Sequence, residues 1–178
     1  MNFEQHIQPF LSYFHQHPFL GELLTFIIAF AESLPIIGTV VPGSVTMTFI
    51  GILAGTGSLS IPLTFSMAVA GAYVGDCVGF GFGHHYQDKI KTMWPFNKHA
   101  HWFDKGRYFI EQHGAKSILI GRFFGPIRST VPMIAGILHM RWIVFLLAAI
   151  PACILWAILY MGPGIVLGNV AMEIPKAV

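Results

Sequence analysis

The chain has 178 residues, of which 54% are hydrophobic and 10% are charged, and its formal net charge is +2. Soluble proteins carry about 25% charged residues, so this composition, with a mean hydropathy of +0.65, excludes an ordinary soluble domain and indicates an all-α integral membrane protein. The length allows one domain with about four to six segments of about 20 residues in the membrane, without space for a separate soluble catalytic domain.

The N-terminal segment, residues 1–18, is amphipathic. Phe3, Ile7, Phe10 and Phe14 recur at near-helical spacing, which favours an amphipathic helix in the membrane interface. A basic region before an apolar core and a small-residue cleavage site are both missing, so we expect no signal peptide.

A first broken region is predicted over residues 19–58. Charged residues are absent from Ser33 to Gly75, and one helix over that stretch would be about 65 Å long, roughly twice a 30 Å hydrocarbon core. The chain must therefore fold back, as a re-entrant hairpin would. The expected interruptions are Pro35, Gly38, Pro42 and Gly43. After a turn at "GTGSLSIP", a spanning helix is expected over residues 61–83.

Residues 88–116 form the strongly polar segment of the chain and contain six of the ten basic residues. The positive-inside rule places this segment on the cytoplasmic side. Its tryptophans and tyrosine are interleaved with Lys and His, which suits a helix in the headgroup layer. An ordinary solvated connector explains the same charges equally well.

A second broken region is predicted over residues 117–138, before one or more C-terminal spanning helices over residues 141–172. Its "PIRSTVPMIAG" resembles "PIIGTVVPGS" of the first region: both have two prolines and a Thr-Val between them. Matching broken segments in two halves of a chain are typical of transporters built from inverted repeats. Chance similarity between two proline-rich loops is the alternative.

Four ionisable residues lie in otherwise apolar sequence: Glu32, Asp76, Arg122 and Arg128. Each costs about 2.5 to 3.5 kcal/mol at the centre of a membrane helix. These residues could form ion pairs that merely join the two halves of the chain. They could also lie near the membrane surface, with their charged ends in the headgroup layer. Arginine, however, presents a fork of donors that fits phosphate oxygens, and helix N-termini exposed at the breaks would add positive dipole.

We therefore assign Arg122 and Arg128 as candidate ligands of an anionic phosphate headgroup. Glu32 and Asp76 are candidates for ion pairing or proton coupling, because anion binding at the arginines could change their protonation. The breaks would line this site, through Pro42, Gly43, Ser44, Pro126 and Pro132.

Metal, cofactor and nucleophile chemistry find little support in the sequence. The nine histidines match no zinc spacing, the two cysteines form no CxxC, and "GFGFG" follows no strand. Ser33, Ser44 and Ser129 lack the context of a hydrolase nucleophile. We expect no metal, no cofactor, no enzymatic activity and no nucleic-acid partner, while small-residue faces would permit a homodimer.

The chain resembles the DedA membrane proteins, bacterial members of the group that carries the VTT domain, first described in SNARE-associated Golgi proteins. The resemblance runs from about Phe30 to Trp156. It rests on Glu32 before Pro42-Gly43, on Gly75-Asp76 followed by spaced glycines, and on "GRFFGPIRSTVPMIAGILHM".

The resemblance implies spanning helices around two opposed re-entrant hairpins and movement of lipid headgroups across the cytoplasmic membrane. Bacterial members are similar to carriers of undecaprenyl phosphate linked to the proton-motive force, and eukaryotic relatives resemble phospholipid scramblases. The family's functional positions carry over onto Glu32, Arg122 and Arg128. The chain departs from the family at Ser44, where a second carboxylate is common.

Three classes of function follow as hypotheses. The first is a lipid transporter or flippase, most directly for undecaprenyl phosphate, with a general phospholipid scramblase as its variant. The second is an intramembrane enzyme acting on a lipid phosphate. The third is a membrane scaffold whose charges only join helices.

Overall fold

The computed structural model describes residues 18–35, 37–40, 43–92, 100–123 and 128–173, and within these ranges the chain forms helices and no strand. The predicted all-α class is therefore confirmed for the described residues. The predicted interfacial helix, residues 1–18, lies outside them except for its last residue. The helices are α2 (Pro18–Ser33), α3 (Ile37–Val40), α4 (Gly43–Gly55), α5 (Ile61–Thr92), α6 (Ala100–His113), α7 (Lys116–Gly121), α8 (Val131–Ile137) and α9 (Trp142–Glu173).

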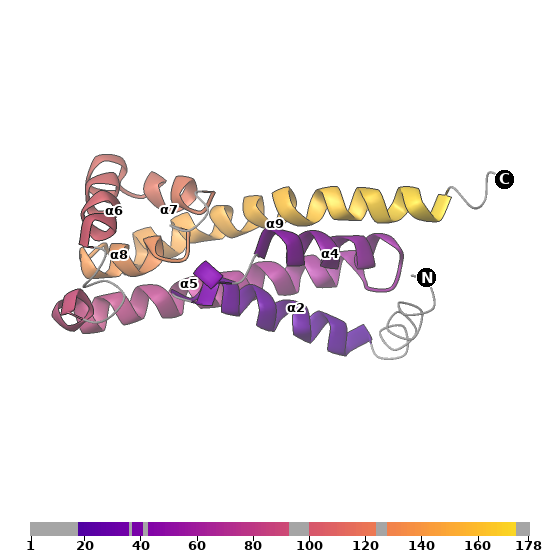
Figure 1. Cartoon of the computed structure of the whole chain (residues 1–178), viewed down its shortest axis with the longest axis horizontal. Helices are drawn as coiled ribbons and strands as arrows, with labels where there is room; N and C mark the ends of the chain where they lie inside the picture. The colour runs from indigo at the N-terminus through magenta and orange to yellow at the C-terminus, as the bar shows by residue number, and fades with distance from the viewer. Residues whose placement is uncertain (1–17, 36, 41–42, 93–99, 124–127, 174–178) are drawn as a thin grey trace.

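Two long helices, α5 and α9, run the length of the molecule (Figure 1). Each has 32 residues, which corresponds to about 48 Å at 1.5 Å per residue and exceeds a 30 Å hydrocarbon core. Both are long and apolar enough to cross a membrane, over Ile61–Tyr86 and Trp142–Glu173. Tyr86 has non-helical backbone angles, so α5 is kinked where its apolar part ends.

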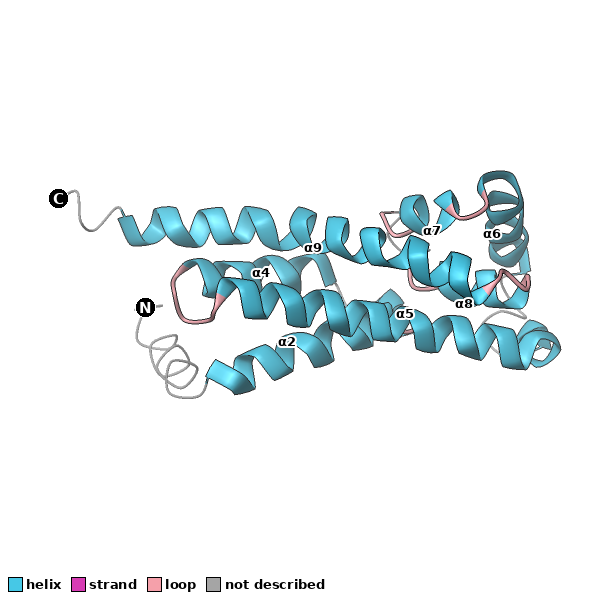
Figure 2. Cartoon of the chain, turned by 180° about the vertical axis from the view of Figure 1, so that it is seen from behind, coloured by secondary structure: helices cyan, strands magenta, loops and turns pink. Residues whose placement is uncertain are grey.

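The shorter helices form two broken segments that enter from opposite ends of the molecule. Helix α2 runs to the middle, and after α3 helix α4 returns to the end where α2 began; α7 and α8 are arranged in the same way at the other end (Figures 1 and 2). Helix α2 packs on α5 and α4 on α9, whereas α7 packs on α9 and α8 on α5. Both breaks therefore lie midway along the two long helices.

The turn between α4 and α5 requires glycine at one position. Gly57 has a φ of +80°, a backbone conformation that glycine adopts without the steric cost of a Cβ atom. Gly57 thus allows the turn that the sequence predicts before the first spanning helix.

Glycines allow the broken segments to lie directly against the long helices. A Cβ atom at Gly71 or Gly75 of α5 would collide with the α2 backbone, at the carbonyls of Phe26 and Phe30. Helices α4 and α9 meet in the same way through Gly51, Gly55, Gly164 and Gly168. Small residues are the usual means of helix association in lipid, where burial of apolar side chains gives no advantage. These small-residue faces, which suggested a homodimer, are occupied within the chain.

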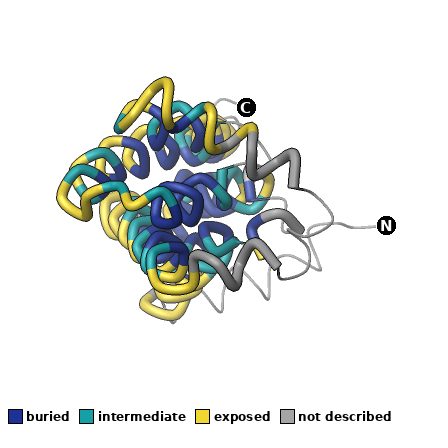
Figure 3. Tube along the Cα trace, turned by 90° about the vertical axis from the view of Figure 1, so that its left-hand side faces the viewer, coloured by how far each residue is buried: buried dark blue, intermediate teal, exposed yellow. Residues whose placement is uncertain are grey.

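Large apolar side chains point outward instead. An end-on view shows buried positions in the centre and exposed ones around the outside (Figure 3). On α9, Leu147 is 64% exposed and Val166 is 61% exposed. A contiguous apolar exterior of this kind is unfavourable in water and suits contact with lipid tails.

Two hydrophobic clusters fill the interior. The first lies among α2, α4, α5 and α9 and includes Ala72 and Met161. The second lies among α5, α6, α7, α8 and α9, and in it the rings of Phe80 and Phe145 stack at 4.2 Å. On α5, Asp76 lies between Ala72 of the first cluster and Phe80 of the second. The chain thus places a buried carboxylate where one apolar core ends and the other begins.

Within the polar segment, Ala100–His113 form α6, which lies at one end of the molecule (Figure 1). Ile110 is buried, and α6 contacts α7 and α8. Arg107 and Glu111 form an exposed ion pair at 2.8 Å, and Tyr108 is 66% exposed. The helix is amphipathic, as a helix in the membrane interface would be.

Candidate functional site

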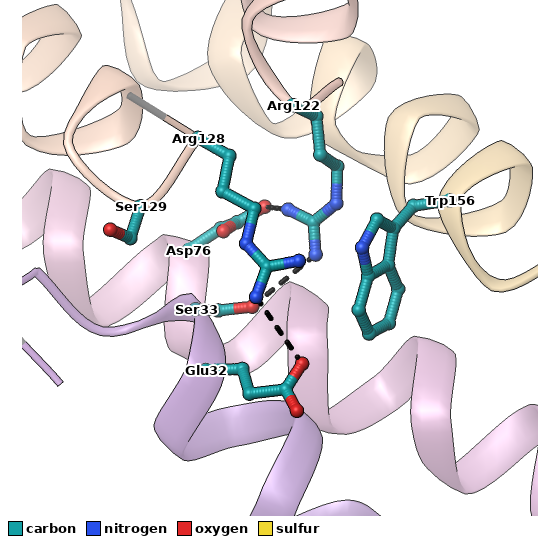
Figure 4. A pocket seen from close by; sticks show the side chains of 7 residues that line it. All are labelled: Glu32, Ser33, Asp76, Arg122, Arg128, Ser129 and Trp156. Atoms are coloured by element: carbon teal, nitrogen blue, oxygen red, sulfur yellow. Dashed lines mark hydrogen bonds and ion pairs between the residues drawn. The ribbon is translucent and has the colours of Figure 1, made fainter. Parts of the chain in front are cut away.

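The two breaks meet at a small polar cavity between the hydrophobic clusters (Figure 4). Its volume is about 10 Å³, which is room for about one water molecule. The seven side chains that line it come from both broken segments and from both long helices: Glu32, Ser33, Asp76, Arg122, Arg128, Ser129 and Trp156.

Arg122 is the residue immediately after α7 and forms a fully buried ion pair with Asp76. Its Nη1 donates to Asp76 Oδ2, and its Nη2 donates to Ser33 Oγ at 3.3 Å. The Cys153 thiol of α9 donates to the same carboxylate oxygen at 3.6 Å. The Arg122 and Asp76 side chains are only 7% and 1% exposed. A charge buried this deeply needs a paired and hydrogen-bonded partner. Asp76 of α5 and Ser33 of α2 supply such partners for Arg122.

Arg128 forms a second and looser pair with Glu32. Arg128 Nη2 lies 3.4 Å from Glu32 Oε2, and the Arg128 side chain is 12% exposed. Thr46 of α4 donates a short hydrogen bond of 2.5 Å to the other carboxylate oxygen, Oε1. A Cβ atom at Gly43 would collide with both the Glu32 carboxylate and the Arg128 guanidinium. Glycine therefore lets the N-terminus of α4 approach the ion pair directly.

The Trp156 ring of α9 faces both arginines. The Arg122 Cζ atom lies 5.2 Å from the ring centroid and the Arg128 Cζ atom 5.8 Å. The π-face of an indole attracts cations, and more strongly when they are desolvated. Figure 4 shows the ring beside both guanidinium groups. The ring therefore stabilises two positive charges within one buried space.

Four buried polar atoms around the cavity have no hydrogen-bond partner within the described part of the chain: Asp76 Oδ1, Arg122 Nε, Ser129 Oγ and Trp156 Nε1. Buried polar groups are normally paired, and each exception requires an explanation. Two of them can only donate and the serine hydroxyl can donate. The cavity thus offers donors to an anion in a region of low dielectric.

The structure brings together the four ionisable residues singled out in the sequence and fixes their pairing. Asp76 pairs with Arg122 and Glu32 with Arg128, an assignment that the sequence left open. Pro132 is buried in α8 and lies beside Gly79 of α5. Pro42 and Pro126 lie outside the described residues, as does the side chain of Ser44.

Sequence reasoning missed five polar or aromatic contributors to the site: Ser33, Thr46, Ser129, Cys153 and Trp156. Ser33 and Ser129 directly follow Glu32 and Arg128, so their proximity to charges was a usable signal. Thr46 follows Gly43 by three residues, which places the two on one face of α4. Trp156 was marked only as a position that the resemblance to the family covers, with no role at the site. Cys153 carries no signal, because α9 is apolar on all sides and only the fold selects its inward face.

The described residues contain no group of three or more His, Cys, Asp or Glu side chains that could hold a metal ion. The fold and this site define an all-helical membrane protein in which two broken segments enclose a buried cluster of paired charges. A family model described as the VTT domain matches residues 41–166, and the chain belongs to this family. The resemblance to DedA membrane proteins is thereby confirmed.

Several relatives share most of the chain. The inner membrane protein YabI of Escherichia coli strain K12 is 36% identical over 149 residues, which cover 84% of this chain and 58% of YabI. An uncharacterized membrane protein of Buchnera aphidicola is 33% identical over 87% of this chain and 60% of its own length. Protein DedA of Escherichia coli strain K12 is 28% identical over 84% of this chain and 69% of DedA.

The chain spans about 60% of the length of the first two relatives. No solved structure matches the chain.

Proposed function

We propose that the protein is a multi-pass protein of the cytoplasmic membrane that moves a phosphate-bearing lipid, in particular undecaprenyl phosphate, from one leaflet to the other. The observation that carries this proposal is the pair of guanidinium groups, Arg122 and Arg128, that share one buried cavity and one aromatic ring. Names of the relatives support a membrane location, since YabI is called an inner membrane protein.

Arginine is the side chain best suited to this task. Its guanidinium stays charged at any relevant pH and binds phosphate oxygens through two parallel hydrogen bonds. Two such groups at the meeting point of the breaks would offset the cost of taking a phosphate headgroup out of water. The lipid tail would remain in the surrounding bilayer, against the apolar exterior of the helices.

The closed cavity, of about 10 Å³, is too small for a phosphate group. Binding therefore requires the breaks to separate and the phosphate to replace one or both carboxylates as partner of the arginines. Asp76 and Glu32 would act as internal counter-ions that keep the arginines paired when no substrate is present. Ligand binding of this kind shifts the protein between two arrangements with similar energies.

The packing of the broken segments supports an inverted repeat of two re-entrant hairpins. Helix α2 packs on α5 as α7 packs on α9, and α4 packs on α9 as α8 packs on α5. In this comparison α2 corresponds to α7, α4 to α8 and α5 to α9, so each contact in one half has an equivalent contact in the other. In transporters built this way, the site lies at the interface of the repeats, and the halves move relative to each other.

Proton coupling is part of the proposal through Glu32. Release of Arg128 to a phosphate would leave the Glu32 carboxylate buried without its counter-charge, a state that favours proton uptake. Glu32 is the group that exchanges partners, because its contact with Arg128 is looser than the contacts that hold Asp76. Thr46 keeps its hydrogen bond to the Glu32 carboxylate when Arg128 leaves. Movement of the lipid could then follow a proton gradient.

The test uses proteoliposomes that contain undecaprenyl phosphate in both leaflets and a phosphatase added outside. Without transport, only the outer-leaflet phosphate is removed, and with transport, removal proceeds to completion. We expect complete removal with the native protein. We expect only the outer-leaflet fraction with the double variant Arg122→Lys, Arg128→Lys, which keeps both charges for Asp76 and Glu32 but loses the planar donor fork.

Arg141→Lys is the matched control, because Arg141 is exposed and lies outside the cavity. Undiminished removal in an Arg122→Ala, Arg128→Ala variant that is folded would overturn the proposed site. Phosphate release before any phosphatase is added would favour an intramembrane enzyme. Removal that stops at the outer leaflet with the native protein would favour a scaffold, and equal movement of other phospholipids would favour a scramblase.

A further inference from the structure

We propose that Trp156 is a third phosphate-contacting residue: its indole Nε1–H donates to a phosphate oxygen while its ring holds the two guanidinium groups side by side. This inference rests on the proposed function. It assigns a direct ligand role to an aromatic residue of the C-terminal helix.

The first observation is the state of the indole nitrogen. Trp156 is 1% exposed, and its Nε1 is a buried donor without a partner among the described residues. An indole N–H can only donate, so nothing except an acceptor can satisfy it. Figure 4 shows the nitrogen on the edge of the ring that faces the Arg122 guanidinium. A phosphate bound by the arginines would bring an oxygen to that edge.

The second observation is the position of the ring relative to the charges. Both guanidinium carbons lie within 6 Å of the ring centroid, at 5.2 Å for Arg122 and 5.8 Å for Arg128. Two like charges repel each other strongly in a medium of low dielectric. An aromatic face that attracts both offsets part of that repulsion when the phosphate displaces Asp76 or Glu32 from its arginine. Trp156 would therefore organise the site as well as contact its ligand.

The unpaired donors also indicate which kind of phosphate the site prefers. Besides Trp156 Nε1, they are Arg122 Nε and Ser129 Oγ, both buried around the same cavity. Three separate donors match the three terminal oxygens of a phosphate monoester. A phosphate diester, as in most phospholipid headgroups, has only two such oxygens. Loss of one donor should therefore weaken monoester binding more than diester binding.

The experiment measures binding of two single-chain probes to the purified protein in detergent micelles by calorimetry. Farnesyl phosphate is the monoester and lysophosphatidylglycerol is the diester. The key variant is Trp156→Phe, which keeps an aromatic face but removes the N–H. We expect its affinity for farnesyl phosphate to fall about tenfold or more, since tenfold is the lower end of the effect of one hydrogen bond to a charged group. The affinity for lysophosphatidylglycerol should change less than threefold.

Trp142→Phe is the matched control, because Trp142 belongs to the same helix, is 43% exposed and does not line the cavity. It should bind both probes as the native protein does. Trp156→Leu removes the ring as well, and it should weaken binding of both probes, since the attraction between the ring and both guanidinium groups is then lost.

Four results would overturn the assignment of Trp156, and they differ in what they say about the proposed function. Unchanged binding of both probes by Trp156→Phe overturns the ligand role of Trp156 alone. Equal weakening of both probes shows that the residue acts only by packing, and overturns the donor role. Failure of the native protein to bind either probe, or native affinity in the Arg122→Ala, Arg128→Ala variant, overturns the proposed phosphate site together with this inference.

Discussion

Arg128 Nη2 lies 3.4 Å from Glu32 Oε2, and this ion pair joins the two broken segments through residues that are 96 positions apart in the sequence. The second ion pair of the site, between Arg122 and Asp76, is held more firmly. Its arginine also bonds Ser33, and its carboxylate also accepts from Cys153. Under the proposed function, we expect the Asp76 pair to hold the two halves together and the Glu32 pair to be the one that opens. This difference makes separate predictions for the two carboxylates.

Asp76→Asn should destabilise the protein strongly. The substitution leaves the Arg122 guanidinium, 6% exposed, buried without a counter-charge, and breaking a buried pair in this way costs about 3 to 5 kcal/mol. Glu32→Gln should cost less, because Arg128 is more exposed and its contact is longer. Thermal unfolding in detergent micelles, followed by circular dichroism, would compare the two.

A double variant, Asp76→Asn with Arg122→Gln, provides the control. Removing both charges of a buried pair is often nearly neutral, so the double variant should recover most of the lost stability. If it unfolds at the same temperature as Asp76→Asn alone, the ion pair does not stabilise the junction of the two halves.

Glu32→Gln should remove the dependence of transport on the proton gradient. The glutamine keeps an oxygen that can accept from Thr46, but it cannot take up and release a proton. Native proteoliposomes should transport more slowly when a protonophore collapses the gradient, and the variant should be slow under both conditions. Glu111→Gln, which changes an exposed residue of α6, should behave as the native protein. If transport by Glu32→Gln still follows the gradient, Glu32 is not the coupling group.

Much of the fold was predictable because charged residues and prolines are easily recognised in an apolar chain and limit where its helices can run. The uncharged stretch from Ser33 to Gly75 is longer than one membrane crossing needs, so the chain must turn within it. Pro35 and Gly38 mark where the first helix must stop, and α2 ends at Ser33. The start of α5 at Ile61 follows from the glycine turn before it. These features act locally, through backbone geometry, so the sequence alone reveals them.

The geometry of the site was harder to predict from the sequence. Arg122 and Arg128 were identifiable because isolated charges in lipid are costly, but nothing in the sequence determines which acid meets which base. That choice depends on how closely α2 approaches α5, and this approach is fixed by backbone contacts at Gly71 and Gly75. The inward position of Trp156 depends instead on how α9 packs on α4, through contacts at Gly164 and Gly168, since the neighbouring α9 residues are equally apolar.

Thr46→Val should impair transport by releasing the Glu32 carboxylate. The substitution keeps the shape of the side chain but removes the hydroxyl that donates to Oε1 at 2.5 Å, at a cost of about 1.5 to 3 kcal/mol for a hydrogen bond to a charged group. Thr46→Ser keeps the donor and should retain native transport. Phosphatase-accessibility assays on both variants would measure the difference. Equal rates for Val and Ser would show that Thr46 does not position Glu32.

Gly164→Ala should disrupt the contact between α4 and α9, whereas Gly162→Ala should not. A Cβ atom at Gly164 would collide with the carbonyl of Thr48 on α4, while one at Gly162 meets nothing within 4 Å. The first substitution forces two backbones apart, and overpacking of this kind costs about 1 to 3 kcal/mol. The second only improves helix propensity, by about 0.5 to 1 kcal/mol. Unfolding temperatures in micelles should therefore fall for Gly164→Ala and stay level or rise for Gly162→Ala. A fall of the same size in both variants would mean that close approach of α4 is not what holds the first broken segment against α9.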